Sequence, residues 1–570
     1  MFDLIIKNGK IVDGSGNPWY KAHIGVTDGK ITAISRNDLG PAQKVIDAQG
    51  LVVSPGFCDL HTHSDITILN NNKALSTLHQ GVTTEGVGQC GTGAYCFKEN
   101  FKPFIAMDMA GFTGQNPEEI DVDWTTLAEW REKAENLGIG INLAPYIPRG
   151  TVRMSVMGVE GKGGERHEPT DEEMQAMKDI IRQGMEEGAF GISTGLRYPW
   201  ERNAYTEEVI EMAKVAAEFG GIYISHMRSE SDTLIESVQE VIRISEEANL
   251  PASITHHKAV FPENWGKATE TMRLLNQARA KGLDVICDFY PWEHAAQGSL
   301  GGVFFPYIDM SKLPPEKMEP TWQNVKSVLE DEEMWQEIKK RCDSLTAEEV
   351  QKNEERKKAL KIKGIKAPEL WDPPKFNYVV YSKNHPEYIG KNLGKIAELM
   401  GFDHFLDAAR ALYLGDEGLT FVAGGIMSEA DIITILLNPA SAISTDGAAF
   451  DLQPDLSRPD FWAHPRNYGT FAKVLGRYVR EMKLLSLEEG IRKMTSLPLS
   501  FLGIRDRGLI QPGMWADITI FDEESIANKA TFAEPAVYPD GIHYVLVNGQ
   551  TAIEDGAYTG ALSGKVLHRQ

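Results

Sequence analysis

The sequence predicts an α/β protein: a (β/α)8 TIM-like barrel joined to a small β-sandwich domain that both chain termini build. Three observations lead to this fold class. The two ends of the chain alternate apolar and polar residues between short turn signals. The middle alternates short apolar runs with helical patterns. The length of 570 residues suits one large barrel with accessory parts.

The small β domain is predicted over residues 1–54 together with 505–570. The first range contains alternating segments such as "FDLIIKNGKIVDG" and "KVIDAQGLVVSPG", separated by NG, DG and QG turns. The segment "YVLVNGQTAIEDGAYTG" has the same character near the other end. Because chain termini often lie close together, the two ends are expected to form one domain.

The barrel is predicted over residues 55–504. Its strands are short apolar runs, most of them followed by an amphipathic helical pattern such as "TEEVIEMAKVAAEFG". Repeated strand and helix units predict a parallel sheet, and eight of them predict a closed barrel. The expected strands are about 57–62, 82–88, 140–146, 188–193, 222–227, 252–257, 284–290 and 441–445.

An insertion at about 300–400 separates the seventh and eighth predicted strands. It carries charged helical sequence, "EDEEMWQEIKKRCDSLTAEEVQKNEERKKALKIKG", followed by proline-rich sequence. One interpretation is a solvated helical excursion. The interpretation that we favour is a partial lid over the barrel mouth, because loops at that face commonly close over a site.

Composition excludes several kinds of partner. The formal net charge of −23 argues against nucleic acid and anionic membranes as partners. No apolar run is long enough to span a membrane, and the start "MFDLIIKNGK" does not resemble a signal peptide. The five cysteines are an odd number and widely scattered, so they do not indicate a disulfide framework, and a cytoplasmic location is expected.

Two histidines follow the first predicted barrel strand in "PGFCDLHTHSD". His61 and His63 are two positions apart, and residues with this spacing in an extended segment point to the same side. Inert hydrogen-bonded histidines and a metal site are about equally good interpretations of this pair alone. The choice depends on what the other strand ends contain.

Residues that bind metals also follow other predicted strands. Chemistry in a barrel of this kind lies at the carboxyl ends of the strands. There the sequence places Cys90 in "GVGQCGTG", His226 in "YISHMRSE", His256 in "SITHHK" and Asp446 in "ISTDG". Each has an ordinary structural interpretation, but their coincidence at one rim predicts a metal site. Imidazole, thiolate and carboxylate together suit zinc better than calcium or magnesium.

The order of these segments resembles the amidohydrolase superfamily and, within it, the N-acyl-D-amino-acid deacylases (D-aminoacylases). The resemblance covers nearly the whole chain. Further segments that carry it are "GAFGISTGLRYP", "HPRNYGTFAKVLGRYVRE" and "MTSLPLSFLGIRDRGLIQPGMWADITIFD". It implies zinc-dependent hydrolysis of N-acyl-D-amino acids, which are small molecules, to a carboxylate and a free D-amino acid. The oligomeric state stays open.

The resemblance also implies the metal ligands. Cys90, His226 and His256 would hold a tightly bound zinc, whereas His61 and His63 would serve a weaker second position that shares Cys90. Many relatives bridge two metals with a carboxylated lysine from the fourth strand. Here that strand reads "GAFGISTG" and has no lysine, which favours a cysteine in that place.

The remaining roles follow from the same resemblance. Asp446 would be the general base that takes a proton from water and gives it to the departing amine. Tyr198 and Lys258 would lie near the substrate carbonyl and carboxylate. Arg466 would clamp the α-carboxylate, which its fork of N–H groups suits.

Some positions depart from the family pattern. Pro148 and Arg149 stand where a Gly-His pair is usual, "FYPWEHAAQGS" (with Trp292, Glu293 and His294) replaces a "YPY" sequence with small hydroxyl residues, and Gln89 replaces asparagine. Taken singly, each is best interpreted as a harmless substitution at the rim. Together they leave the precise substrate open.

Two other functions are alternatives to a deacylase. One is a hydrolase of another amide, such as a cyclic imide or a dipeptide, on the same metal site. Lys258 and Arg466 disfavour it weakly, because a carboxylate clamp fits an amino acid better than a neutral ring. The other is a non-catalytic scaffold with the same fold, which the complete set of predicted ligands and Asp446 disfavour.

Overall fold

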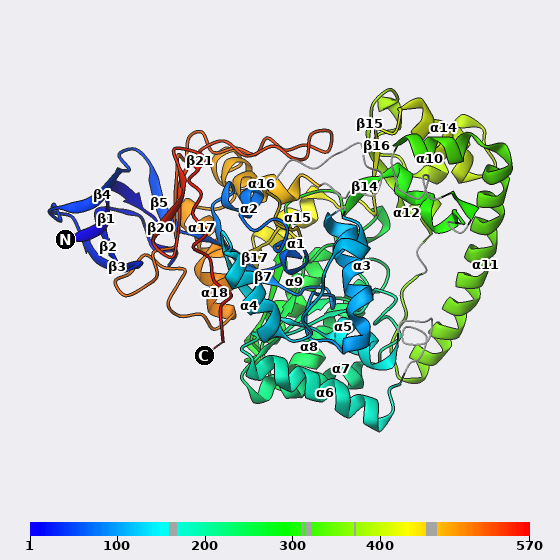
Figure 1. Cartoon of the computed structure of the whole chain (residues 1–570), viewed down its shortest axis with the longest axis horizontal. Coiled ribbons are helices and arrows are strands. Elements are labelled where there is room, and N and C mark those ends of the chain that lie inside the picture. Colours follow the sequence, from blue (N-terminus) through cyan, green and yellow to red (C-terminus); the bar gives the residue numbers. More distant parts are fainter. Residues whose placement is uncertain are drawn as a thin grey trace.

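The computed structural model describes residues 1–113, 115–158, 168–309, 312–314, 322–369, 372–451 and 464–569. Figure 1 shows three parts: a β-rich end that contains the N-terminus, a central barrel, and a helical insertion on the opposite side. None of the helices within these ranges is long and apolar enough to cross a membrane.

Parallel strands in two sheets surround the centre of the molecule. Their orders are β6-β7-β8 and β9-β10-β11-β12-β13-β17. A single residue, Tyr146, separates β8 from β9, and a parallel bridge between Thr62 and Gly447 joins the first strand segment to the last, so the strands follow one another around a ring. The predicted barrel is therefore confirmed, with strands β6 (Phe57–Asp59), β7 (Val82–Val87), β8 (Asn142–Pro145), β9 (Ile147–Pro148), β10 (Gly191–Gly195), β11 (Ile222–His226), β12 (Ala252–Ile254), β13 (Val285–Phe289) and β17 (Ser441–Ile443).

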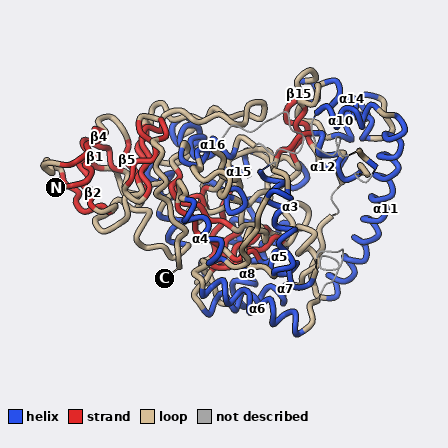
Figure 2. Tube along the Cα trace, in the orientation of Figure 1, coloured by secondary structure: helices blue, strands red, loops and turns tan. Residues whose placement is uncertain are grey.

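Helices cover the outside of these strands (Figure 2). Two of them, α4 and α6, begin with a capping box, in which a threonine and a glutamate three residues later satisfy each other's backbone N–H groups. The barrel helices are α1 (Ser64–Thr67), α2 (Leu75–Leu78), α3 (Lys102–Thr113), α4 (Leu127–Leu137), α5 (Arg149–Met157), α6 (Asp171–Glu186), α7 (Thr206–Glu218), α8 (Leu234–Ala248), α9 (Ala268–Ala280), α15 (Glu429–Leu436), α16 (Arg466–Lys473), α17 (Leu487–Met494) and α18 (Ser496–Phe501).

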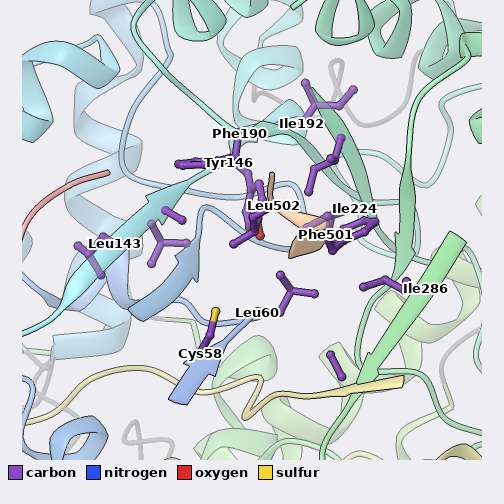
Figure 3. Packing of buried hydrophobic residues seen from close by; sticks show 14 of the residues in the cluster. Cys58, Leu60, Leu143, Tyr146, Phe190, Ile192, Ile224, Ile286, Phe501 and Leu502 are labelled. Atoms are coloured by element: carbon purple, nitrogen blue, oxygen red, sulfur yellow. The ribbon is translucent and has the colours of Figure 1, made fainter. Parts of the chain in front are cut away.

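The main core lies inside the ring and between the ring and its helices. Figure 3 shows side chains from several barrel strands, such as Ile192, Ile224 and Ile286, which belong to one cluster with Phe501 and Leu502 from the end of α18. All of these are at least nine-tenths buried. Burial of apolar area at about 25 cal/mol per Å² makes this core the main stabilising feature. It also fixes the strand ends, from which the site residues project.

The insertion is a folded unit with its own apolar core, which includes Phe304, Trp335, Leu412 and Tyr413. Its helices and its three-stranded sheet lie between Gln297 and Ala423, and the predicted bounds of about 300–400 stay a prediction. Residues 310–311, 315–321 and 370–371 lie outside the described part. Its main elements are β14 (Gln297–Ser299), α10 (Trp322–Glu330), α11 (Glu332–Ile362), α12 (Pro373–Phe376), β15 (Tyr378–Ser382), α13 (Leu393–Met400), α14 (Phe405–Gly415) and β16 (Thr420–Ala423). Its action as a lid stays a prediction.

The two chain ends meet in one nine-stranded sheet. β5 pairs with β1 in parallel and with β18 antiparallel, which joins the N-terminal strands directly to the C-terminal ones. The strands are β1 (Phe2–Ile11), β2 (Tyr20–Thr27), β3 (Lys30–Ser35), β4 (Ala42–Asp47), β5 (Val52–Pro55), β18 (Ile518–Phe521), β19 (Ile542–Val547), β20 (Gln550–Glu554) and β21 (Ala557–Tyr558). The exact domain boundaries stay predictions.

Candidate metal centre

The His61 and His63 side chains converge on Asp446. The backbone of Asp446 donates to the His61 carbonyl at 3.0 Å, and His63 N–H donates to the Gly447 carbonyl at 2.7 Å. These bonds join the ends of the first and last barrel strands. As a result, Nε2 of His61 lies 3.3 Å and Nε2 of His63 lies 3.5 Å from Oδ1 of Asp446. The two imidazoles therefore converge, as the sequence predicted.

Cys90 lies at the centre of the other candidate ligands. Its Sγ is 3.4 Å from Nε2 of His61, 3.5 Å from Nδ1 of His226 and 3.5 Å from Nε2 of His256. All four residues are buried. The donor atoms form two groups that share Cys90, and within each group they lie within 4.8 Å of one another. The groups are His61, His63, Cys90 and Asp446, and Cys90, His226 and His256.

The donor set fits zinc. Imidazole nitrogen, cysteine sulfur and carboxylate oxygen are the ligands that zinc takes in proteins. The ring nitrogens that face the Cys90 sulfur are Nε2 of His61, Nδ1 of His226 and Nε2 of His256, at 3.4–3.5 Å. Metal-binding atoms brought together in this way are what a zinc site requires.

Burial sets the protonation of these groups in the absence of a cation. It raises the pKa of the Cys90 thiol well above its usual range, lowers the pKa of His61 to about 3, and lowers the pKa of His226 well below its usual range. The imidazoles of His61 and His226 are therefore already neutral, which is the form that binds a metal. A divalent cation favours the thiolate of Cys90 in the same place.

Asp446 remains ionised despite its burial. Burial by itself would raise the pKa of this carboxyl, but the charge of Arg466, together with His256 and hydrogen bonds from His61 and His63, holds the pKa well below its usual range. Nη1 of Arg466 lies 2.7 Å from Oδ2 of Asp446. Asp446 is thus a carboxylate at neutral pH, as an acceptor of protons must be.

The turn that carries Cys90 is held by neighbouring elements. Asp65 accepts hydrogen bonds from the N–H groups of Gly88 and Ala94, both at 3.0 Å, so it spans the turn on either side of Cys90. The N–H of Thr151, in the first turn of α5, donates to the Gly91 carbonyl at 2.8 Å. Gly91 has φ +72°, and a Cβ there would lie 2.7 Å from the Gly195 nitrogen. Only glycine fits this close approach.

Three site residues have a left-handed backbone conformation. The φ angles are +54° at Cys90, +33° at His256 and +50° at Asp446. Such conformations cost residues other than glycine about 1–3 kcal/mol each, and they cluster at functional sites. At each of these positions the chain turns sharply just after a strand, so that the side chain is directed toward the common centre.

Glu230 and Lys258 flank His256. Oε1 of Glu230 is 2.8 Å from Nδ1 of His256 and 2.6 Å from Nζ of Lys258. A carboxylate on the outer nitrogen of a metal-binding histidine fixes the tautomer and leaves the inner nitrogen free for the ion. Lys258 therefore lies beside the predicted ligands, with its ammonium paired to Glu230.

Tyr198 and Arg466 complete the surroundings. The ring of Tyr198 lies 4.6 Å from the ring of His226. Two cations, Arg466 and Lys258, lie over the ring of Tyr290 at 5.0 Å and 5.2 Å. The structure thus places all the predicted site residues around one centre. The roles assigned to them individually stay predictions.

The carboxylates of Asp65, Glu230 and Asp288, which were not predicted from the sequence, also support this centre. Asp288, on β13, accepts from the backbone of His256 at 2.8 Å and from Ser444 at 2.7 Å. A signal was present for each of them. Asp65 ends the His-x-His segment, Glu230 follows His226 by four residues, and Asp288 is a charged residue within an apolar strand.

Arg149 lies directly after β9, at the start of α5. It is fully buried and pairs with Glu201 and Glu208, and its Nη1 lies 2.5 Å from Glu201. Glu201 in turn accepts from the backbone of Gly195, beside the Cys90 turn. Trp292 is also buried, and its indole donates to Thr470 at 3.0 Å. Gln89 donates to the Leu60 carbonyl at 2.8 Å.

Comparison with known proteins agrees with this site. The sequence model of the amidohydrolase family matches residues 44–302 and 431–553. The chain belongs to the amidohydrolase family. The unmatched stretch between these ranges corresponds to most of the insertion, so the family match covers the barrel and part of the terminal sheet.

Several family members resemble the whole chain. A D-aminoacylase and an N-acyl-D-glutamate deacylase from Alcaligenes xylosoxydans xylosoxydans are each 30% identical to it; the matches cover 100% of this chain and 98% and 96% of theirs. A crystal structure of N-acyl-D-glutamate deacylase from Bordetella bronchiseptica, with zinc and a phosphonate mimic of the tetrahedral intermediate, has a TM-score of 0.73 at 29% identity and covers 100% of this chain and 99% of that one. A D-aminoacylase structure described as having a binuclear metal centre also has a TM-score of 0.73 at 29% identity, with full coverage of both chains.

Proposed function

We propose that this amidohydrolase is a zinc-dependent N-acyl-D-amino-acid deacylase. The observation that carries the proposal is the placement of Cys90 between two groups of ligands, with Asp446 and Arg466 beside them. The relatives that match over the full length are a D-aminoacylase and deacylases of N-acyl-D-glutamate and N-acyl-D-aspartate. The site geometry and the named activities of these relatives both support hydrolysis of a linear amide next to a carboxylate.

Cys90, His226 and His256 would hold the tightly bound zinc, and His61, His63 and Asp446 would offer a second position that shares Cys90. Zinc supplies a water of lowered pKa and polarises a carbonyl group. Glu230 contacts Nδ1 of His256, so that Nε2 of the same ring is directed toward the centre. Asp65 fixes the turn on which Cys90 lies.

Asp446 moves the proton in the proposed reaction. It is ionised and lies within 3.5 Å of both His61 and His63, beside the predicted ligands. Its carboxylate accepts the proton of that water during attack on the amide carbon. It then returns the proton to the nitrogen of the departing amino acid, which would otherwise be a poor leaving group.

Arg466, Lys258 and Tyr198 would orient the substrate. Arg466 presents a guanidinium 2.7 Å from Asp446, so a carboxylate that it binds lies next to the reacting amide. Lys258 adds a second positive charge near the same centre. Tyr198, beside His226, would donate a hydrogen bond to the carbonyl oxygen as negative charge develops there. These cations favour an acyclic N-acyl amino acid over an uncharged cyclic imide.

The proposed partners are small molecules. A net charge of −23 opposes binding to nucleic acid or to anionic membranes. All five cysteines are buried and unpaired, which supports the proposal of a reducing, cytoplasmic location.

The test is a substrate screen with the zinc-loaded protein. N-acetyl, N-formyl and N-succinyl derivatives of D- and L-amino acids are assayed for release of the free amino acid. We expect release from D-substrates and at least tenfold slower release from the matching L-substrates. Cys90→Ala, which removes the ligand common to both groups, serves as the inactive control. Failure to hydrolyse any N-acyl-D-amino acid would contradict the proposal.

A further inference from the structure

The long helix α11 of the insertion contacts the loop that follows β10. Figure 1 shows α11 along the outer edge of the insertion, reaching down to the level of α6 and α7. Nη2 of Arg202, in that loop, lies 3.4 Å from Glu349 on α11. Beyond the end of α11, Lys366 pairs with Glu236 on α8 at 2.8 Å. The insertion and the barrel are therefore in direct contact here.

A cavity of about 170 Å³ lies at this contact. This is much larger than the roughly 10–15 Å³ that one water requires. Its lining contains three cationic side chains, Arg202, Lys352 and Arg356, together with the carboxylates of Glu349 and Glu355 and two asparagines. The cavity is separate from the metal centre, because none of the candidate metal ligands lines it.

The charges in the cavity do not cancel. Glu349 pairs with Arg202, and Lys352 pairs with Glu348 at 2.8 Å. Arg356 is only 8% exposed, and its guanidinium contacts neutral oxygens, those of Asn353 at 2.5 Å and Pro368 at 3.3 Å. Among the described residues no carboxylate lies within ion-pair distance of it. A buried cation without a counter-charge is costly.

One guanidinium nitrogen in each of two residues that line the cavity also lacks a partner. Nε of Arg356 and Nε of Arg202 are both buried without a hydrogen-bond partner in the described part of the chain. Burial, followed by the charges of Arg202, Arg228 and Arg197, lowers the pKa of Arg356 to about 10. Arg356 is still charged at neutral pH, and it lies in a locally positive environment.

We propose that this cavity binds a small oxyanion, a phosphate group or a carboxylate, held by Arg356 and Arg202. Arginine presents paired N–H groups that match the oxygens of both anions. The cavity has room for such a group, and Arg356 and Arg202 both line it. The anion would complete the contact between α11 and the barrel.

The site is linked to the metal centre through the chain. The backbone N–H of Arg202 donates to the Tyr198 carbonyl at 2.7 Å, so both residues belong to one turn. Arg228, two residues after His226, donates to the Arg202 carbonyl at 3.0 Å. A bound anion would thus hold the insertion against the turn that carries Tyr198. This inference does not depend on the deacylase activity.

The test measures anion binding to the zinc-loaded full chain. Inorganic phosphate, succinate and chloride are titrated at constant ionic strength while the melting temperature is followed, and calorimetry measures affinity. We expect phosphate or succinate to raise the melting temperature in a saturable way that chloride does not reproduce. A response to phosphate alone identifies a phosphate-bearing ligand, and a response to succinate alone identifies a carboxylate.

Variants locate the binding. Arg356→Met should lose at least tenfold in affinity for the anion, whereas its melting temperature without anion should not fall, because an unpaired buried charge has been removed. Arg341→Met is the matched control, since Arg341 lies on the same helix and outside the cavity. The proposal is overturned if the wild type responds equally to all three anions, or if Arg356→Met binds phosphate and succinate as the wild type does.

Discussion

Cys90 is the one residue that both groups of candidate ligands share. Its sulfur lies within 3.5 Å of a nitrogen from each of His61, His226 and His256, which come from three different strand ends. A serine or alanine at this position would leave the histidines without the central donor. The proposed centre therefore depends on a residue type that in most proteins is simply a small buried side chain.

The Asp446→Asn variant tests the proposed role of Asp446 as general base and acid. The amide keeps the size of the side chain and a hydrogen bond to Arg466 but cannot accept the proton from water. We expect turnover to fall by about 10²–10⁴-fold, the usual contribution of general acid–base catalysis. Zinc at Cys90, His226 and His256 should be retained. Metal analysis and kcat, measured on the same preparation, check both statements; turnover within twofold of the wild type would exclude Asp446 from the mechanism.

Arg466→Met tests the carboxylate clamp and its link to chirality. A D-substrate anchored at its carboxylate and at its amide has one remaining direction for its side chain, so loss of one anchor should weaken the preference for D over L. We expect kcat/KM for the best D-substrate to fall, and the loss should correspond to about 2–5 kcal/mol of transition-state free energy. Arg477→Met is a suitable control, because Arg477 forms an exposed ion pair with Glu429. An unaffected D-substrate would make Arg466 a structural residue.

The elements that matter most for the site are the short turns after the barrel strands. Those that carry Cys90, His256 and Asp446 have a left-handed backbone conformation, and a carboxylate from another segment holds each of these three turns. Asp65 holds the Cys90 turn, Asp288 holds the backbone of His256, and Asp59 accepts from the backbone of Thr445 at 3.1 Å, just before Asp446. The ligand positions are thus set by buried hydrogen bonds, which a rigid ring of strands supports.

Asp65→Asn tests this support. An amide can accept only one of the two backbone N–H groups, so a buried donor at Gly88 or Ala94 loses its partner, at a cost of about 1–3 kcal/mol. We expect zinc affinity to fall by about 10–100-fold, as for other residues that position metal ligands. Competition with a chromophoric chelator measures it. Asp123→Asn, at an exposed ion pair, is the control and should leave the affinity unchanged. Equal affinities in the two variants would refute the role of Asp65.

For the whole molecule, the metal centre ties together distant parts of the chain. Its candidate ligands extend from His61 to Asp446, and the ring that brings them together is completed by the contact between Thr62 and Gly447. An ion bound here would link several strands that are otherwise held together by backbone hydrogen bonds and by packing of the core. Metal binding should therefore act on global stability as well as on activity.

Removal of the metal tests this coupling. A ligand present at about 1,000 times its dissociation constant adds about 4 kcal/mol to the free energy of unfolding. Chelator-treated protein should therefore melt several degrees below the zinc-loaded protein, and addition of zinc should restore the difference. Cys90→Ala should show little change on chelation. A melting temperature that does not respond to zinc in the wild type would contradict the proposed site.

The sequence by itself determined the strand order, the rim residues and the ligand types. Apolar runs indicate approximately where each barrel strand lies, and the carboxyl ends of parallel strands meet at one rim. His61, Cys90, His226, His256 and Asp446 could therefore be grouped from the sequence alone. Only the tertiary structure decided which neighbours hold them. The burial of Arg149 between two glutamates, the pairing of Glu230 with His256 and the separate core of the insertion all depend on contacts between distant segments. A periodic pattern says which side of an element is buried, but not which partner lies against it.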